Sequence, residues 1–275
     1  MHLADVVRRG RTPIDDRFDA ATVAGLELWD VLAVVGEHRE RLWSHMLGLC
    51  SSVENNRELC QTAYRKAIGG ENTTAIATFA GAVGQVEDAL RTAVPGMADQ
   101  LSQRMQPLLA VWKTRGPGLL NQVSRMVEPG VLADQTQVVG VLPVVGGSAR
   151  AMLSYNLVHI EAVLADVDPV LPEVLRLAWG LLQLNVDLPK YSDAIHGDRL
   201  SLIAGLALVP ITLAAGEIVE LVRLDDETLE RAISSWCHDL DTPEDAVAMV
   251  QDWWITYLES RPPWTVAITA LERML

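Results

Sequence analysis

Basic side chains are scarce in this sequence of 275 residues, and acidic ones outnumber them. Only Lys66, Lys113 and Lys190 are lysines, and the chain has 22 basic against 36 acidic residues, a formal net charge of −14. A protein that binds nucleic acid by neutralising phosphates needs a surface of the opposite sign. The composition therefore argues against a nucleic-acid-binding protein.

Cysteine is also rare, with Cys50, Cys60 and Cys237 as the three examples and no Cys-x-x-Cys pair among them. Disulfide frameworks use even numbers of cysteines, and thiolate metal sites use closely spaced pairs. The N-terminal segment lacks the apolar run of about 7 to 15 residues that a secretory signal contains. We therefore expect reduced thiols and a cytoplasmic protein.

Long uncharged runs are limited to one segment, the 17 residues from Leu200 to Gly216. This length just reaches the lower limit for crossing a bilayer, and the segment contains Pro210. Its flanks show no lysine or arginine asymmetry of the kind that orients a membrane helix. We interpret the segment as a buried core helix bent at Pro210 and predict no membrane span.

The common catalytic motifs are missing as well. The sequence contains no Gly-x-x-x-x-Gly-Lys, Gly-x-Gly-x-x-Gly, Gly-x-Ser-x-Gly or His-Glu-x-x-His pattern. These patterns are typical of phosphate cradles, dinucleotide sites, serine nucleophiles and zinc peptidases, respectively. The sequence therefore predicts no cofactor and no metal site.

Apolar residues do recur at helical spacing through the first half of the chain. The pattern then changes: residues 137–145 are rich in valine, and residues 155–164 alternate between apolar and polar side chains. The predicted fold is mainly α, with a helical region at 1–130 and an α+β region at 131–275. In the second region we expect a β-hairpin or a pair of neighbouring strands at about 137–164, packed on apolar helices. Whether the two regions share one core is open at this point.

Three helix boundaries follow from local signals. Residues 20–49 form one amphipathic stripe, which predicts a single long helix. A helix that begins near Met97 should end at the Arg115–Gly118 segment, which contains Pro117. Thr242 precedes Pro243 and two acids, a combination that predicts a helix start.

Five polar residues lie in apolar surroundings and are the candidate site residues: His159, Glu161, Glu173, Arg176 and Asn185. His159 and Glu161 share one side of the predicted strand, where they could act as an acid/base pair if that side lines a cleft. Glu173 and Arg176 are three residues apart, so they can pair on one helix face. Because charges in so apolar a segment are costly unless paired, a purely structural ion pair is the alternative.

The order of strands followed by a helix resembles that of zinc peptidases, in which the helix carries two histidines and a glutamate. The corresponding segment here reads Leu-Pro-Glu-Val-Leu-Arg-Leu-Ala-Trp and has no histidine. The resemblance implies a degenerate arrangement that has lost the zinc motif and with it the metal chemistry.

Two functions are consistent with these observations. Residues 201–275 carry 4 − 13 = −9 charges, and eight of the fourteen aromatic residues of the chain are tryptophans. Exposed tryptophans would mark an interface, whereas buried ones would belong to the core. The first hypothesis is therefore an interaction protein that contacts a protein partner or forms a homo-oligomer. The second is an enzyme or small-ligand binder with a metal-free site between the 137–164 hairpin and the 170–185 helix.

Overall fold

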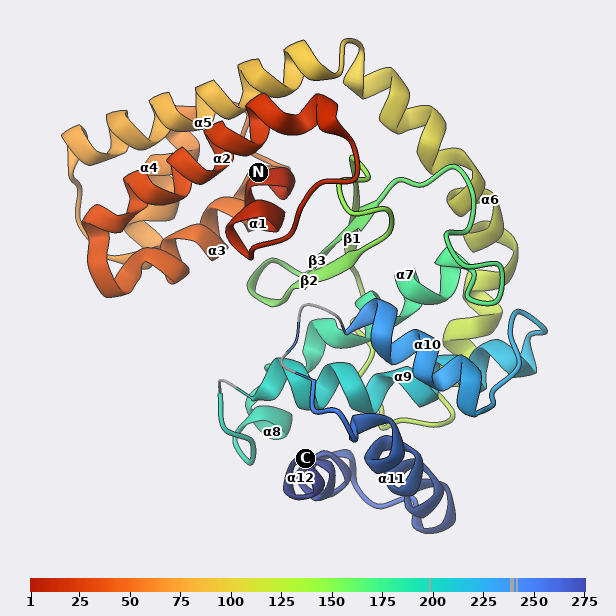
Figure 1. Cartoon of the computed structure of the whole chain (residues 1–275). Coiled ribbons are helices and arrows are strands. Elements are labelled where there is room, and N and C mark those ends of the chain that lie inside the picture. The colour runs from red at the N-terminus through yellow and green to blue at the C-terminus, as the bar shows by residue number, and fades with distance from the viewer. Residues whose placement is uncertain (198, 238–239, 241) are drawn as a thin grey trace. The chain divides into compact units, whose positions relative to one another are not determined.

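The computed structural model describes residues 1–197, 199–237, 240 and 242–275. The chain divides into two compact units (Figure 1). Unit 1 comprises Met1–Arg104 with Val139–Gly147, and unit 2 comprises Met105–Val138 with Ser148–Leu275. Both units are built mainly from helices, and the strands form one small sheet. The predicted mainly α fold with a small β element is confirmed.

Unit 1 is a group of packed helices. Its elements are α1 (His2–Arg8), η1 (Asp16–Phe18), α2 (Asp19–Val31), η2 (Leu32–His38), α3 (Arg39–Leu49), α4 (Asn56–Ala67), α5 (Thr73–Ala93) and the first part of α6 (Met97–Val123). Helix α2 packs against both α1 and α5, and α4 packs against α3 and α5 (Figure 1). The Asn72 side chain caps α5 by accepting a hydrogen bond from the Ala75 N–H at 3.0 Å.

The single helix predicted for residues 20–49 is wrong. Helices α2 and α3 are separate, and the short 3₁₀ segment η2 between them contains a kink at Gly36. Gly36 has φ 56° and ψ −127°, a conformation that only glycine adopts without strain. The apolar periodicity continues across this residue, and so it gives no sign that the chain turns there.

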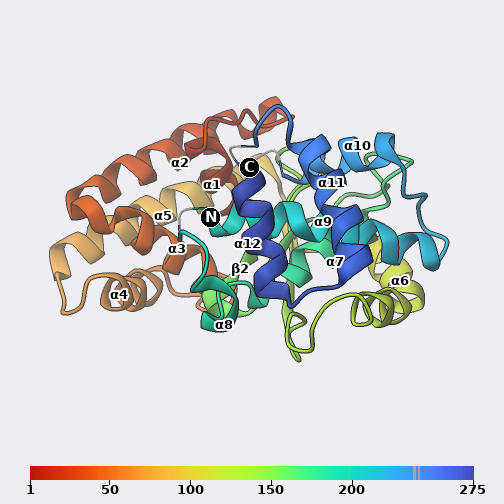
Figure 2. The ribbon, with the colours of Figure 1, turned by 90° about the horizontal axis from the view of Figure 1, so that it is seen from below.

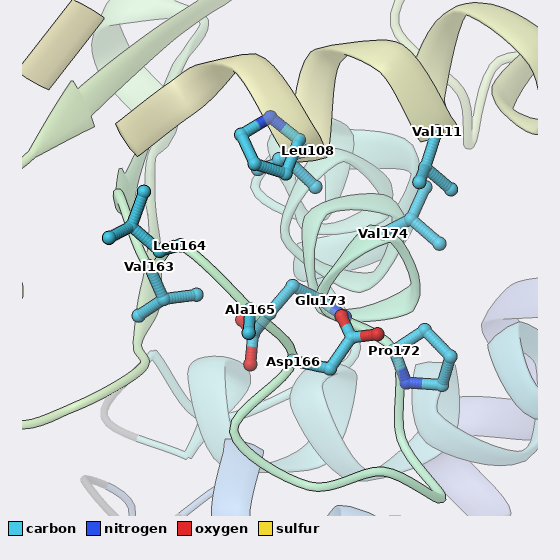
Figure 3. Close-up of a pocket in the computed structure, with 10 residues that line it drawn as sticks. Leu108, Val111, Val163, Leu164, Ala165, Asp166, Pro172, Glu173 and Val174 are labelled. Carbon is cyan, nitrogen blue, oxygen red and sulfur yellow. The ribbon is translucent and has the colours of Figure 1, made fainter. Parts of the chain in front are cut away.

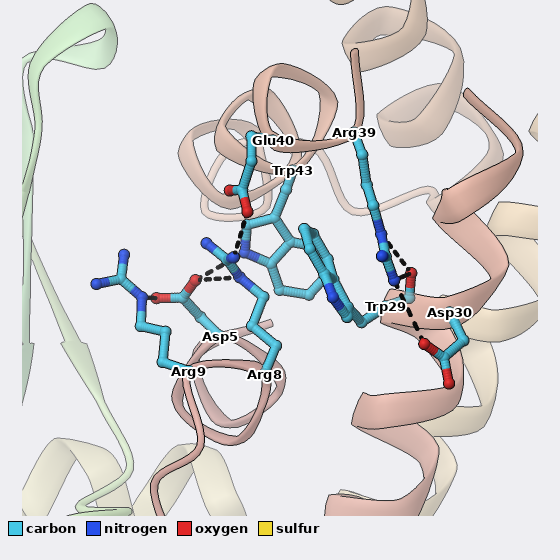
Figure 4. A network of polar contacts seen from close by, with 8 residues as sticks. All are labelled: Asp5, Arg8, Arg9, Trp29, Asp30, Arg39, Glu40 and Trp43. Atoms are coloured by element: carbon cyan, nitrogen blue, oxygen red, sulfur yellow. Dashed lines mark hydrogen bonds and ion pairs between the residues drawn. The ribbon is translucent and has the colours of Figure 1, made fainter. Parts of the chain in front are cut away.

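A network of charged and aromatic side chains fixes α1 in unit 1 (Figure 4). The buried Asp5 carboxylate accepts hydrogen bonds from Trp43 Nε1 at 2.7 Å and from Arg8 Nε at 3.0 Å. The Arg8 guanidinium also lies 4.5 Å from the ring centroid of Trp29, and its Nη1 donates to Glu40 at 3.0 Å. The Asp5 carboxylate and the Arg8 guanidinium therefore each have partners that offset their desolvation.

The three strands are β1 (Gln137–Val141), β2 (Ala149–Met152) and β3 (Leu157–Glu161), in the sheet order β1-β3-β2. Strands β2 and β3 are antiparallel, and Ala149 lies opposite Ile160. The predicted neighbours β1 and β3 are confirmed, but the short strand β2 between them in sequence was not predicted. The alternating segment 155–164 is also longer than the strand that forms. Tyr155 belongs to η3 (Leu153–Tyr155), and Leu164, which is 56% exposed, lies beyond the end of β3.

Unit 2 is arranged around α9 (Leu200–Ile218). Helices α7, α10, α11 and α12 all pack against α9, which crosses the middle of the unit (Figure 2). These surrounding elements are α7 (Glu173–Leu182), η4 (Gln183–Asn185), α8 (Pro189–Ser192), α10 (Asp226–Trp236), α11 (Ala246–Ser260) and α12 (Trp264–Met274). Within the described part of the chain, α9 is the one helix long and apolar enough to cross a membrane, but 72% of its apolar window is buried inside the protein. This burial agrees with the predicted core helix.

Two predicted helix boundaries are wrong. Helix α6 continues to Val123 with Pro107 and Pro117 inside it, although proline removes a backbone donor at each position. The Trp112 ring lies over Gly116 in this stretch, at 2.7 Å from where a Cβ would stand, so the last turns are held by side-chain packing. Helix α11 begins at Ala246, because the Thr242 hydroxyl donates to upstream carbonyl groups instead of capping a helix.

The tryptophans do not form an exposed surface. Trp29 and Trp112 are half-buried, and the other six are buried, at 7% exposure or less: Trp43, Trp179, Trp236, Trp253, Trp254 and Trp264. Indole N–H groups join helices inside unit 2, where Trp179 donates to the Gly205 carbonyl at 2.9 Å and Trp253 to the Ala267 carbonyl at 2.7 Å. These residues are core residues in the described structure.

Candidate ligand pocket in unit 2

Strand β3 and helix α7 place four of the predicted site residues inside unit 2. Glu161, His159, Glu173 and Arg176 are each 3% exposed or less. Helix α7 packs directly on the sheet at Gly180, where a Cβ would stand 3.1 Å from a methyl group of Val158. This close approach explains how a helix as apolar as α7 comes to bury its two charged residues together with those of the neighbouring strand.

Glu173 and Arg176 form an ion pair one helical turn apart, as their spacing predicts. Arg176 Nη1 lies 3.4 Å from Glu173 Oε2, and each side chain is 4% exposed. Neither carboxylate oxygen of Glu173 accepts a hydrogen bond of normal geometry from any residue that the structure describes, and Arg176 Nε and Nη1 likewise donate none. The pair is therefore close enough to attract but leaves buried polar atoms unsatisfied, which is costly in a protein interior.

More acidic groups than basic groups surround this pair. Glu161, Glu173 and Asp168 all act electrostatically on Arg176, and Asp166 acts on Glu173. Arg231 Nη1 lies 3.2 Å from Asp168 Oδ2 and its Nη2 lies 2.8 Å from Glu227 Oε1, while Arg150 of β2 stands opposite His159. Among the described residues that line the neighbouring pocket, the charged ones are Asp166 and Glu173, and both are acidic.

Burial and like charge both disturb the titration of Glu173. Burial is the largest cause and raises the pKa of its carboxyl, and the nearby carboxylates of Asp166 and Glu161 act in the same direction. Arg176 and the Val167 backbone oppose this shift without cancelling it. Burial also lowers the pKa of Arg176. Glu173 is therefore a carboxyl group that gives up its proton less readily than an exposed glutamate.

The Glu173 side chain lines a small pocket (Figure 3). The pocket has a volume of about 120 Å³, and two of its lining residues, Val111 and Leu164, are exposed. Apart from Glu173 and Asp166, its walls are apolar and come from α6, the loop after β3 and the start of α7: Pro107, Leu108, Val111, Val163, Leu164, Ala165, Pro172 and Val174. This space exceeds that of one water molecule several times over and can hold a small organic group.

Asp166 shapes this pocket through the backbone. Its Oδ1 accepts a hydrogen bond at 2.8 Å from the Glu173 N–H, which belongs to the first turn of α7. The N-cap residue Pro172 offers no side-chain acceptor, so a carboxylate seven residues upstream satisfies this donor. The loop is thereby closed onto the helix, with the Glu173 side chain beneath it.

The remaining predicted residues lie outside the pocket. His159 faces the same side of β3 as Glu161 and stands opposite Arg150 of β2, but neither His159 nor Glu161 lines the pocket wall. Asn185 is half-buried in η4, where its Nδ2 donates to the Gly130 carbonyl at 2.8 Å. Asn185 therefore fastens a loop and does not join the charged cluster.

Sequence reasoning missed the apolar walls and Asp166. Leu108 and Val111 belong to α6, more than fifty residues before α7, and nothing in the local sequence connects the two helices. Asp166 did carry a signal, since an acidic residue shortly before a helix often satisfies its first N–H groups. The separation of seven residues hid that role, because capping residues normally stand next to the helix start.

The chemistry available here is that of a buried carboxyl group beside an apolar surface. Among the described residues, no group of three or more His, Cys, Asp or Glu side chains is arranged to hold one metal ion. A carboxyl group with a raised pKa can bind a hydrogen-bond donor or a cation, or exchange a proton with a bound molecule.

Comparison with known proteins adds no relative to this description. The chain matches no protein-family model, no curated protein and no solved structure.

Proposed function

We propose that unit 2 is a cytoplasmic small-ligand-binding module, with its metal-free site in the pocket between α6, the loop 163–166 and the start of α7. The observation that carries this proposal is Glu173. Its carboxylate is buried, has no hydrogen bond of normal geometry from the described residues beyond the influence of the Val167 backbone, and lines a pocket that opens to solvent. Small-molecule sites combine apolar walls with a few such polar groups.

The structural alternative is an ion pair that serves only the fold. A pair selected for stability would satisfy its remaining polar atoms, because a buried ion pair gains little otherwise. The Asp5 carboxylate of unit 1 is satisfied in this way, with hydrogen bonds of 2.7 Å and 3.0 Å, although Arg9 Nε beside it lacks one from the described residues. The contrast favours a binding role for the Glu173 side of the pocket.

The test is to fill the pocket without disturbing the core. Val111 lines the pocket and is 39% exposed, so Val111→Trp should occupy the space from the α6 side. Leu109→Trp is the matched control, because Leu109 is 45% exposed on the same helix and does not line the pocket. We expect n-butanol and n-butylamine to shift the methyl NMR signals of Leu108 and Val174 in the wild type and in Leu109→Trp, but not in Val111→Trp. Equal shifts in all three proteins would show that the pocket is not the site.

A second candidate function is self-association through the acidic C-terminal helices. The tryptophans do not support it, but three other apolar side chains do: Ile255 and Leu258 on α11 and Val266 on α12 are 57%, 43% and 56% exposed. Ile255 and Leu258 are three residues apart and share one helix face. Such apolar exposure is a feature of contact surfaces.

Light scattering after size exclusion, at low and at high salt, decides this second candidate. Self-association predicts a species larger than the 30.1 kDa chain that Ile255→Glu converts to monomer. Because the local charge is −9, high salt should favour the larger species by screening repulsion. A monomer under both conditions would exclude self-association.

A further inference from the structure

We propose that the pocket of unit 2 takes a primary alkylammonium ion, with the ammonium group on Glu173 and the alkyl chain along the apolar walls. This inference rests on the proposed function and specifies the chemistry of its ligand. It concerns a small cation of about four carbon atoms, or a larger molecule that ends in such a group.

The apolar walls of the pocket favour a ligand with an alkyl chain. Leu108, Val111 and Leu164 contribute only hydrocarbon to the pocket, from two separate elements. A ligand of high polarity would lose its hydration there without compensation, whereas a short alkyl chain gains by leaving water. The space of about 120 Å³ limits this part to a few carbon atoms.

The Glu173 carboxylate favours a ligand that carries hydrogen-bond donors. Its side chain is 4% exposed, and apart from the Val167 backbone donor and the Arg176 ion pair at 3.4 Å, neither oxygen has a hydrogen-bond partner of normal geometry among the described residues. An ammonium group supplies three N–H donors, and hydrogen bonds between charged partners are about twice as strong as neutral ones. Among the described residues Arg176 is the cation paired with Glu173, and Glu161 and Asp168 also act on Arg176, so its charge is shared among several carboxyl groups.

The acidic side chains that line the pocket favour a cation over an anion. Asp166 and Glu173 line the pocket, and no basic side chain of the described residues does, so a bound ammonium ion would meet carboxyl groups of opposite charge. A carboxylate or phosphate would instead place like charge beside these two carboxyl groups in a partly buried site. The first N–H of α7, which could otherwise attract an anion, already donates to Asp166.

The experiment compares three probes of similar shape by NMR titration at neutral pH: n-butylamine, n-butanol and n-butyrate. We expect wild-type protein to bind n-butylamine at least about tenfold more tightly than n-butanol, and n-butyrate most weakly. Glu173→Gln should remove the preference for the amine and leave n-butanol binding unchanged. Glu259→Gln is the control, since it removes one negative charge from an exposed position on α11 that does not line the pocket.

The outcomes separate the two proposals. If n-butanol binds in the pocket but n-butylamine binds no better, or if n-butyrate binds most tightly, the ammonium inference is overturned and the binding module stands. If none of the probes shifts the pocket methyl signals, the proposed function is overturned too. Should Glu173→Gln fail to fold, the comparison of the three probes on wild-type protein still decides the inference, and Asp166→Asn should weaken n-butylamine alone by reducing the local charge.

Discussion

At the scale of single residues, the two units differ in how far their buried charged groups are hydrogen-bonded. In unit 1 the Asp5 carboxylate receives hydrogen bonds from an indole and a guanidinium group, and Arg8 lies against aromatic rings. In unit 2 Glu173 and Arg176 are as deeply buried but leave hydrogen-bonding atoms unused. The first arrangement supports the fold, whereas the second costs stability and is retained, on our proposal, for binding.

Removing Asp5 should destabilise unit 1 strongly. Asp5→Ala leaves the Trp43 N–H without its acceptor and Arg8 with Glu40 as its main partner, so we expect the free energy of unfolding to fall by about 3 kcal/mol. Asp88→Ala is the control in the same unit, because the Asp88–Arg91 pair is 76% and 73% exposed and should contribute less than about 0.5 kcal/mol. Urea unfolding measures both. Similar effects for the two variants would contradict this account of the Asp5 network.

Glu173 should make stability depend on pH in a known direction. Its pKa is raised in the folded protein, so the folded state holds a proton that the unfolded state has already released. The stability of the wild type relative to Glu173→Gln should therefore fall as pH rises from the ordinary glutamate pKa, about 4.3, to the raised folded value. The steepest slope would be about 1.4 kcal/mol per pH unit. Urea unfolding of both proteins across this range is the measurement, and a difference that rises with pH would show that the sign is wrong.

At the scale of elements, Gly36 interrupts a segment that the sequence predicts as one helix, whereas Pro117 lies inside a helix that the sequence predicts to end there. Gly36 divides a stripe that is apolar throughout, because its positive φ turns the chain between α2 and α3. Pro107 and Pro117 do not divide α6, where apolar packing on both sides of each proline holds the helix. Local propensity thus set the ends of an element only where tertiary contacts did not override it.

Two glycine substitutions in unit 1 should have opposite effects. Gly36→Ala forces a side chain into a positive-φ conformation and should cost about 1 to 3 kcal/mol, although no atom lies within 4 Å of the added Cβ. Gly81→Ala adds a Cβ at an equally open position inside α5 and should stabilise by about 0.5 to 1 kcal/mol. Thermal and urea unfolding give both values. A neutral Gly36→Ala would mean that the kink relaxes without strain.

At the scale of the whole molecule, the most apolar segment organises unit 2. Helix α9 is almost fully buried because α7, α10, α11 and α12 cover it, and the tryptophans of those helices complete the same core. The described acidic residues of this last part of the chain are exposed or half-buried, on or between helices whose inner faces hold the core. Such a division lets one segment be strongly apolar and its neighbours strongly acidic.

Charge on α9 should be tolerated only at its end. Leu208 is fully buried, so Leu208→Asp should cost more than about 4 kcal/mol and abolish the near-ultraviolet circular dichroism of the tryptophans in unit 2. Ile218, the last residue of the same helix, is 55% exposed, and Ile218→Asp should leave this spectrum unchanged. A Leu208→Asp protein with the native spectrum would contradict the central position of α9.

The amino-acid sequence by itself determined the fold class, most helices, the position of the strands β1 and β3 and the burial of α9, because apolar periodicity and composition report directly on which face is buried. It also singled out Glu173 and Arg176, since a charge in an apolar segment stands out without a structure. Only the tertiary structure placed α6 and Asp166 around Glu173, buried the tryptophans and set Asn185 apart. These features depend on contacts between segments far apart in the chain, and no local pattern encodes which distant surfaces will meet.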